Sequence, residues 1–477
     1  MDEFKGKKVL TFLRSKKARF RGTRVLIFGL GLNQGGVGSA KFFAQQGATV
    51  RVTDLKSKQI LKLSLDQLKS FPNITYTLGE HKNEDIEWAD LIIKNPAVKP
   101  GNVHIEYARK QGKKVQQDMG IFLDFVKPSQ IIGITGTKGK STIASLIYDV
   151  LNKYLAKSWH VKLTHAGHVQ RIHTWNNIIL AGNIGKSVLD TIPHVKPDTL
   201  VVLEISSFQL EAFEQHKVSP KWAVITNITP DHLNYYQTME EYIQSKIIIG
   251  KYQTKSDYLF LKKFDPITSK PNFLKGLKAQ IIYFSKEDLP KDFKPRLKGE
   301  HNLENIAAAF AITKTFGMDE ETILEVTLHF KGISFRMELI KVWNGVKIIN
   351  DTTATSPEAG IQAIKTFPGC ILICGGMNKG MDYTKYATIV GNSVKKVFFL
   401  EGDSTDQIKK LMKNKDLIAG TYDDLEKLLI DVKEIVKKGD IILFSPAATS
   451  FNLFQNEFDR GRKFNKAVEK VFGANIS

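Results

Sequence analysis

Residues 130–142 read QIIGITGTKGKST, a β-branched apolar run that stops at glycines and continues into a helical pattern. Glycines between a strand and a helix leave backbone N–H groups free to bind phosphate oxygens, and the positive end of the helix favours the same anions. In such a loop Lys140 meets the outer phosphates of a nucleotide and Ser141 reaches its Mg²⁺. The strict motif needs glycine at position 134, where the chain has Ile134. The stretch therefore predicts a variant phosphate-binding loop, with a plain glycine turn as the alternative.

The same order of apolar strand, polar turn and helix recurs along the whole chain. The candidate strands are 24–28, 49–53, 90–93, 130–135, 199–203, 223–227, 346–350, 370–374, 397–400 and 440–444. Alternation at this spacing predicts parallel sheets with helices on both faces, so the expected fold class is α/β. We expect three domains: a Rossmann-like one at 1–118, a central P-loop ATPase-type one with a mainly parallel sheet at 119–332, and a second Rossmann-like one at 333–477.

The composition excludes several classes of protein. With 477 residues, 42% hydrophobic and 25% charged, the chain is too long for one core and too apolar to be disordered. Its apolar runs are of strand length and no apolar signal segment follows Met1, so we expect no membrane insertion and a cytoplasmic location. Cys370 and Cys374 lie on one side of a strand-like run, which predicts two buried thiols and no disulfide framework.

The formal net charge of +20 has three possible explanations: nucleic-acid binding, a small anionic substrate, or a lysine-rich solvated surface. The sequence shows no stripe of basic and aromatic residues and no zinc-finger spacing. More than half of the excess lies in residues 1–118, which suits an anionic substrate of one domain better than a polynucleotide across three. We therefore expect no nucleic-acid partner, and a basic nucleic-acid-binding ATPase stays as a remote alternative.

Polar side chains follow two of the predicted strands at their carboxyl ends, where open parallel sheets bind ligands. Asp54 stands at the end of the strand that follows the glycine-rich turn 29–38. Its carboxylate could accept a hydrogen bond from a ribose or base. The alternative is that these glycines serve only close packing of helix and strand. Glu204 closes the run VVLE in the sheet of the phosphate loop, where a carboxylate is the expected partner of the nucleotide's Mg²⁺.

Two further residues, His232 and Lys246, are weak candidates for a functional role when their own sequence pattern is considered alone. His232 follows the strand AVITN in the turn ITPDH, and a histidine there is more often structural than a ligand. Lys246 lies on a helix that Thr238 caps with Glu241 three residues on, and the pattern alone predicts a solvated lysine. A further set of histidines suggests zinc, but its spacing fits no single helix or strand face: His160, His165, His168 and His173.

Together these motifs resemble the Mur ligase family across essentially the whole chain. The matching motifs are TGTKGKST at 135–142, AGNIG at 181–185, LEISSFQLE at 203–211, NITPDHL at 227–233, GEHNLEN at 299–305, SFRME at 334–338, NDTTAT at 350–355, CGGMNKG at 374–380 and SPAATSF at 445–451. The SSFQLE run is similar to the branch that adds glutamate to UDP-N-acetylmuramoyl-L-alanine in peptidoglycan synthesis. The resemblance implies an ATP-dependent amide ligation through an acyl phosphate.

The resemblance also implies roles for the residues around the loop. Lys140 would stabilise the phosphoryl group during its transfer. Ser141 and Glu204 would hold one Mg²⁺, and His232 would serve a second. Lys246 stands in the pattern Y-x-x-S-K. It matches the family lysine that CO₂ carbamylates, which turns a cation into an anionic ligand for Mg²⁺.

Binding residues follow from the same motifs. ATP would be contacted by Gly136, Thr137, Lys138, Gly139, Lys140, Ser141, Thr142, Asn302, Asn305, Arg336 and Asp351. The nucleotide sugar would be contacted by Asp54, Asn183, Ser206 and Gln209, and glutamate by Thr355, Lys379, Ser450 and Phe451. The chain is expected to act as a monomer.

The sequence departs from the family pattern near the incoming amino acid. Residues 351–357 read DTTATSP where D-S-K-A-T-N is common, and residues 456–458 read NEF where N-F-E is usual. D-glutamate is the expected substrate, and an L-glutamate-adding variant of the same ligase stays open. Another ligase of the folylpolyglutamate type is less favoured, because of the SSFQLE run and the N-terminal nucleotide-binding domain.

Overall fold

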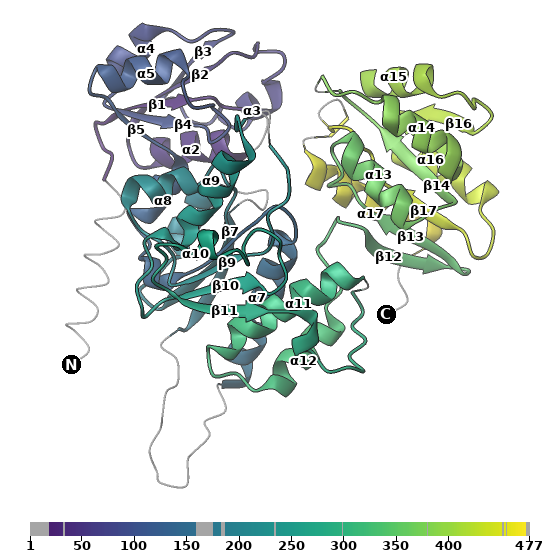
Figure 1. The fold of residues 1–477 in the computed structure, drawn as a ribbon. Coiled ribbons are helices and arrows are strands. Elements are labelled where there is room, and N and C mark those ends of the chain that lie inside the picture. The colour runs from purple at the N-terminus through teal and green to yellow at the C-terminus, as the bar shows by residue number, and fades with distance from the viewer. Residues whose placement is uncertain are drawn as a thin grey trace. The chain divides into compact units, whose positions relative to one another are not determined.

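The computed structural model describes residues 19–31, 34–158, 175–182, 187–232, 235–297, 299–378, 380–450, 453–454 and 456–473. The chain divides into two compact units, Met1–Phe330 and Lys331–Ser477, and each is described by itself (Figure 1). Within these described ranges no helix is both long and apolar enough to cross a membrane.

The first sheet of the first unit has five parallel strands in the order β3-β2-β1-β4-β5. Its strands are β1 Arg24–Phe28, β2 Thr49–Asp54, β3 Ile74–Leu78, β4 Leu91–Lys94 and β5 Lys114–Gln116; its helices are α2 Gln34–Gln45, α3 Lys62–Asp66, α4 Asn83–Trp88 and α5 Val103–Lys110. The chain turns to opposite sides of β1 to form β2 and β4. The carboxyl end of β1 is therefore the switch point at which such sheets bind ligands.

The second sheet has six parallel strands in the order β11-β10-β9-β6-β8-β7. Its strands are β6 Ile131–Thr135, β7 Asn177–Gly182, β8 Thr199–Glu204, β9 Trp222–Ile225, β10 Tyr258–Lys262 and β11 Gln280–Phe284. The remaining elements of the unit are α6 Asp118–Leu123, α7 Lys140–Ser158, α8 Leu210–His216, α9 Met239–Lys251, α10 Pro271–Leu274, α11 Glu300–Lys314 and α12 Glu320–His329, with 3-10 turns at Pro128–Gln130, Val188–His194 and Lys286–Asp288.

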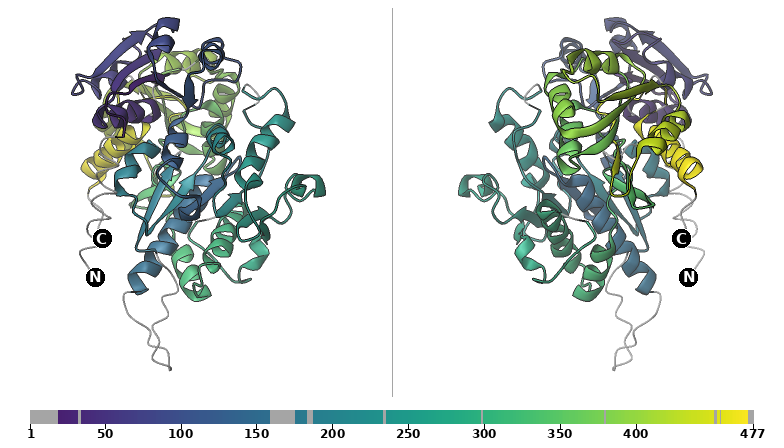
Figure 2. Two further views of the ribbon diagram at one scale, coloured as in Figure 1. Left: turned by 90° about the vertical axis from the view of Figure 1, so that its left-hand side faces the viewer. Right: turned by 90° about the vertical axis from the view of Figure 1, so that its right-hand side faces the viewer.

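Helices cover both faces of this sheet (Figure 2). All five residues of β6 are buried, and alternate side chains enter different cores. Ile131 packs with α8 and α9, whereas Ile132 and Ile134 pack with α7 and α11. A strand buried on both faces is the reason why its sequence is a continuous apolar run rather than an alternating one.

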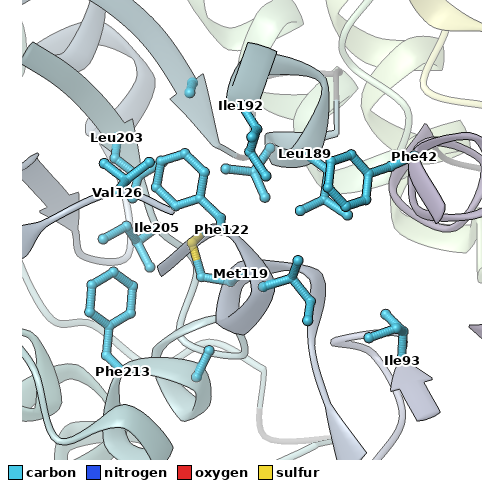
Figure 3. Close-up of a cluster of buried hydrophobic side chains, with 14 of the residues drawn as sticks. Phe42, Ile93, Met119, Phe122, Val126, Leu189, Ile192, Leu203, Ile205 and Phe213 are labelled. Atoms are coloured by element: carbon cyan, nitrogen blue, oxygen red, sulfur yellow. The ribbon is translucent and has the colours of Figure 1, made fainter. Parts of the chain in front are cut away.

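One hydrophobic core joins the two sheets of the first unit (Figure 3). Phe42 and Ile93 come from the first sheet and its helix α2, while Leu203 and Phe213 come from β8 and α8. Phe122 on α6 is fully buried among them. The first 330 residues therefore form one compact unit although they contain two sheets.

The second unit is a six-stranded sheet in the order β12-β13-β17-β14-β15-β16, in which β12 alone pairs antiparallel. Its strands are β12 Glu338–Trp343, β13 Val346–Asn350, β14 Cys370–Gly375, β15 Val394–Leu400, β16 Ile418–Tyr422 and β17 Ile441–Phe444; its helices are α13 Pro357–Thr366, α14 Thr384–Ser393, α15 Asp403–Leu411, α16 Leu425–Ile435 and α17 Glu457–Phe472. Cys370 and Cys374 are free, buried and in one core, as predicted.

The predicted α/β class with three parallel-sheet domains is confirmed, whereas some element ends differ. The strand β9 stops at Ile225, two residues before the predicted end, because Thr226 and Asn227 leave the sheet to bind the phosphate loop. Thr238 caps α9 as predicted, but the Glu241 carboxylate accepts from the Gln237 N–H rather than from that of Thr238. The domain boundaries at 118 and 332 stay a prediction.

We predict that Phe122→Ala lowers the free energy of unfolding by about 3–5 kcal/mol, because it leaves a cavity in the core that both sheets share. Phe264→Ala is the control, since Phe264 is 64% exposed and its loss should change stability by less than about 0.5 kcal/mol. Urea unfolding followed by circular dichroism measures both. Equal effects of the two substitutions would contradict the shared core.

Candidate active site

The glycine-rich loop follows β6 and opens α7, as the sequence predicts. Gly136 has φ +140°, and a Cβ there would lie 1.9 Å from Thr226 Oγ1. Gly139 has φ +88°, and a Cβ there would lie 2.4 Å from Asn305 Oδ1 on α11. Both glycines are required by a left-handed backbone and by the close approach of a neighbour. The second contact also places the predicted nucleotide residue Asn305, whose amide donates to Asn302 Oδ1 at 3.1 Å, against the loop.

Side chains from the turn after β9 and from α9 fix the shape of this loop. Thr226 Oγ1 and Asn227 Nδ2 donate to the Lys138 carbonyl at 2.6 and 2.9 Å, and Lys138 N donates to Asn227 Oδ1 at 3.1 Å. The hydroxyls of Thr137 and Tyr242 lie 3.1 Å apart. The motifs quoted above contain both Tyr242 and Asn227, but the sequence pattern does not predict this role for either residue.

Lys140 folds back over the loop that precedes it. Its Nζ donates to the carbonyls of Gly136 at 3.0 Å and Thr137 at 2.9 Å. Ser141 and Thr142 are half-buried in the first turn of α7. The N-terminus of a helix, glycine amides and an ammonium group thus lie within one turn, which is the chemistry that binds a polyphosphate.

Glu204 ends β8 beside this loop, because β8 pairs with β6 in a register that sets Ile134 opposite Glu204. The side chain is 2% exposed, and its Oε2 atom has no hydrogen-bond partner among the described residues. A buried carboxylate oxygen without a partner is costly, and a divalent cation would satisfy it. Among the described residues, no group of three or more His, Cys, Asp or Glu side chains is placed so that it could hold a metal ion.

Lys246 reaches the same loop from α9, and the structure corrects the prediction of a solvated side chain. It is 2% exposed, and its Nζ donates to the Gly136 carbonyl at 2.9 Å and to Thr135 Oγ1 at 3.3 Å. Burial, and then the positive charge of Lys140, lowers the pKa of Lys246 well below its ordinary value. A lowered pKa favours the neutral, nucleophilic form of the lysine amine over the cation.

His232 lies at the same sheet edge in a left-handed backbone conformation, with φ +55°. It is exposed by more than a third, and its ring centre is 4.9 Å from that of Phe208. The pKa of His232 is lowered, chiefly by burial. The negative charge of Asp231 opposes this shift, and the positive charges of Lys246 and Lys140 add to it. The neutral imidazole that results is the form that binds metals.

The described sugar-binding candidates, Asp54, Ser206 and Gln209, lie at the carboxyl ends of strands in the two sheets of the first unit. Ser206 and Gln209 form the turn after β8, where Ser206 N and Oγ donate to Gln209 Oε1 at 3.0 and 3.1 Å. Asp54 is buried at the end of β2 and accepts from Gly31 N at 2.8 Å and Lys56 N at 2.9 Å. Asp54 thus holds the glycine turn of the first sheet, while its predicted contact with a ribose or base stays a prediction.

The second unit carries the remaining described candidates. Asp351 follows β13 and accepts from Met337 N and Ser445 Oγ, and burial raises its pKa to about 6. Arg336 is exposed, and its charge acts on Asp351. Thr355 is half-buried before α13, and Ser450 is buried after β17, where its Oγ has no partner within the described part of the chain. Several predicted residues lie outside the described residues: Asn183, Lys379, Phe451, His160, His165, His168 and His173.

Arg460 on α17 is a buried residue whose role the sequence pattern does not predict. Its guanidinium donates to Thr352 Oγ1 at 2.9 Å, to the Thr352 carbonyl at 2.8 Å and to the Ala448 carbonyl at 3.0 Å. Burial lowers the pKa of Arg460 to about 9. It ties together the loops that carry Asp351 and Ser450, and nothing in the pattern around it distinguishes it from the solvated charges of the same helix.

Three family models match the chain in order. Residues 23–117 match the Mur ligase MurD-like N-terminal domain, residues 134–296 the Mur ligase middle domain, and residues 335–448 the Mur ligase glutamate ligase domain. Two solved structures share the fold. MurC of Thermotoga maritima is 18% identical with a TM-score of 0.53, over 94% of this chain and 99% of its own. MurF of Acinetobacter baumannii is 12% identical with a TM-score of 0.54, over 97% and 98%.

Relatives of higher identity span nearly the whole chain. The UDP-N-acetylmuramoylalanine–D-glutamate ligase of Roseiflexus sp. (strain RS-1) is 34% identical over 94% of this chain and 98% of its own. The ligase of the same name from Borreliella afzelii is 34% identical over 94% and 97%, and that from Clostridioides difficile is 32% identical over 94% and 99%. With three matched domains in the same order and relatives at this level, the chain belongs to the Mur ligase family.

Proposed function

We propose that the protein joins D-glutamate to UDP-N-acetylmuramoyl-L-alanine with ATP, as a monomer in the cytoplasm, in peptidoglycan synthesis. Similarity to D-glutamate ligases over 94% of the chain supports the reaction. The observation that best supports phosphoryl transfer is the arrangement at the phosphate loop. There Lys140 and the buried Lys246 both donate to the Gly136 carbonyl, beside the Glu204 oxygen that has no partner among the described residues.

The reaction takes place in two steps. An oxygen of the alanyl carboxylate attacks the γ-phosphorus of ATP, and ADP leaves, which gives an acyl phosphate. The amine of glutamate then attacks the acyl carbon, phosphate leaves, and the amine loses a proton. The protein's work is positioning and charge neutralisation, because both steps bring anions together. Lys140 neutralises the phosphoryl group in transfer, and the amides of the loop from Gly136 to Thr142 hold the phosphates.

The donor set around the loop fits Mg²⁺. Ser141, Glu204, His232 and a carbamylated Lys246 would supply oxygen and nitrogen ligands for two ions, and the buried Glu204 oxygen is the observation that favours a cation site. When bound, the ions neutralise negative charge between the phosphates and the carboxylate. The carbamate forms when the neutral Lys246 amine attacks the carbon of CO₂ and releases one proton, so a buried neutral amine becomes an anion beside Lys140.

The substrates are assigned to the residues that the family motifs mark. The nucleotide sugar is held by Asp54, Asn183, Ser206 and Gln209. Asn302 and Asn305 on α11, with Arg336 and Asp351 from the second unit, contact the nucleotide. Glutamate is held by Thr355, Lys379, Ser450 and Phe451, with the Lys379 ammonium as the natural partner of a carboxylate.

We predict that Lys246→Ala loses about two orders of magnitude or more in kcat, because an anionic ligand and its charge at the phosphate loop disappear. Added acetate or formate should restore part of the rate by supplying a carboxylate. The matched control is Lys251→Ala, since Lys251 is exposed on the same helix and pairs with Glu214. Activity of Lys246→Ala equal to that of the control would remove the carbamate from the mechanism.

The lowered pKa of Lys246 predicts a specific pH dependence. Only the neutral amine reacts with CO₂, and the buried amine is neutral at pH values where an exposed lysine, with a pKa of about 10.4, is protonated. Enzyme kept in CO₂-free buffer should therefore regain activity on addition of bicarbonate at about pH 7, and the gain should decline as the pH falls through the pKa of Lys246. No gain at any pH would contradict this assignment.

The amino-acid substrate is tested by phosphate release from ATP with UDP-N-acetylmuramoyl-L-alanine and a panel of amino acids. D-glutamate should support turnover that also requires Mg²⁺ and the nucleotide sugar, because the relatives of highest identity named above are D-glutamate ligases. Turnover with L-glutamate alone would reassign the enzyme to an L-glutamate-adding variant, as the DTTATSP segment at 351–357 leaves open. Turnover with neither enantiomer would refute the function.

A further inference from the structure

Lys94 is a buried lysine in the first sheet that has no part in the chemistry above. It is the last residue of β4, and its side chain is 3% exposed. Its Nζ lies 2.6 Å from Glu211 Oε2 on α8 and 3.4 Å from the Val98 carbonyl. Lys94 belongs to the first sheet, whereas Glu211 lies on α8, the helix that follows β8 of the second sheet. The ion pair therefore joins the layers of the two sheets.

The Glu211 carboxylate also interacts with side chains from several other elements. Its Oε2 also accepts from Gln117 Nε2 at 2.9 Å, while its Oε1 accepts from Gln215 Nε2 at 3.2 Å and lies 3.6 Å from Arg109 Nη2. Arg109 on α5 and Lys94 belong to the first sheet and its helices, and Gln117 lies in the segment that leads into α6. A carboxylate on α8 is therefore the meeting point of three segments that precede the second sheet.

A second contact ties the same segment of the first sheet to the second. The hydroxyl of Tyr235 lies 3.5 Å from the Pro96 carbonyl and 3.4 Å from that of Val98. Tyr235 follows the turn of His232, and Glu211 follows the turn of Ser206 and Gln209. Residues 94–98 thus contact residues that follow two of the turns of the second sheet in which predicted site residues lie.

We propose that the Lys94–Glu211 ion pair is a positioning element for the substrate that bridges the two sheets, an inference that rests on the proposed function. The nucleotide part of the substrate is assigned to the first sheet, at Asp54, and its alanyl carboxylate to the phosphate loop of the second. A ligand that occupies two binding sites gains affinity when the distance between the sites is fixed. Once one part of the ligand is bound, the other part is already held near its own site. The ion pair fixes that separation.

The energetics of buried ion pairs agree with this role. Desolvation offsets most of the attraction between two buried charges, so such a pair adds little net stability. Breaking it by removal of one partner leaves the other charge buried and unpaired, which disturbs its surroundings. Glu211 is 29% exposed and keeps Arg109 nearby, whereas Lys94 is 3% exposed. Loss of the carboxylate is therefore the more disruptive change.

The test compares ligands that occupy one sheet with the substrate that occupies both. Glu211→Gln should raise the KM for UDP-N-acetylmuramoyl-L-alanine about tenfold or more, while the Kd for UDP alone and the KM for ATP change less than about twofold. The matched control is Glu214→Gln, one turn along the same helix, where Glu214 pairs with Lys251 at the same 2.6 Å but both side chains are more exposed, at 38% and 49%. This control should leave all three constants unchanged.

A double-mutant cycle and a conservative variant complete the experiment. Lys94→Met with Glu211→Gln should be no worse than Glu211→Gln alone, because the unpaired ammonium is removed as well. Glu211→Asp keeps the charge and should give an intermediate KM, which keeps the test open if Glu211→Gln does not fold. Parallel weakening of UDP, ATP and the bridging substrate, or additive losses in the cycle, would overturn the positioning role. Wild-type enzyme without turnover would refute the proposed function and this role together, whereas wild-type turnover with unchanged variants would overturn the role alone.

Discussion

Two lysine side chains donate to one carbonyl oxygen, that of Gly136, and the rest of the site is arranged around this convergence. Two ammonium groups on one acceptor repel each other, and burial raises the cost. The lowered pKa of Lys246 relieves the repulsion, since the neutral amine shares the carbonyl without a second charge. A substrate with several negative charges would relieve it further. The loop is thus electrostatically incomplete without a polyanion, which is a suitable starting state for a phosphoryl-transfer enzyme.

Several other groups are held in positions that do not favour stability. The Glu204 oxygen and the Ser450 hydroxyl are buried without partners among the described residues, and burial holds the pKa of Asp351 at about 6. Each would be better solvated in the unfolded chain. They are kept in place by rigid neighbours: the fully buried strand β8 behind Glu204, and Arg460 with its three hydrogen bonds between the loops of the second unit. Groups that lower the stability of the fold at the site are thus compensated by well-packed and hydrogen-bonded neighbours.

The local features could be predicted from the sequence, and the long-range ones could not. The stretch 130–142 carries its strand, its turn and its helix start in adjacent residues, and the alternating side chains of the CILIC run decide where Cys370 and Cys374 point. The burial of Lys246 depends on a loop more than a hundred residues away, and Lys94 pairs across a similar separation. The hydrophobic periodicity of the sequence predicts that both lysines are exposed to solvent. The shared core of the first two sheets is likewise invisible in the pattern, because a continuous apolar run predicts a buried strand without indicating which segment covers it.

That shared core has a consequence for the way the protein is made. Phe42 and Ile93 share their core with Leu189, Ile192 and Phe213, which leave the ribosome roughly 100 to 170 residues later. A nascent chain that ends near residue 118 therefore displays an apolar face with nothing to cover it. Such a face attracts chaperones or other unfinished chains. The first sheet is a domain in its strand order, but in biosynthesis it depends on the second, and a recombinant fragment cut between them inherits the same exposed surface.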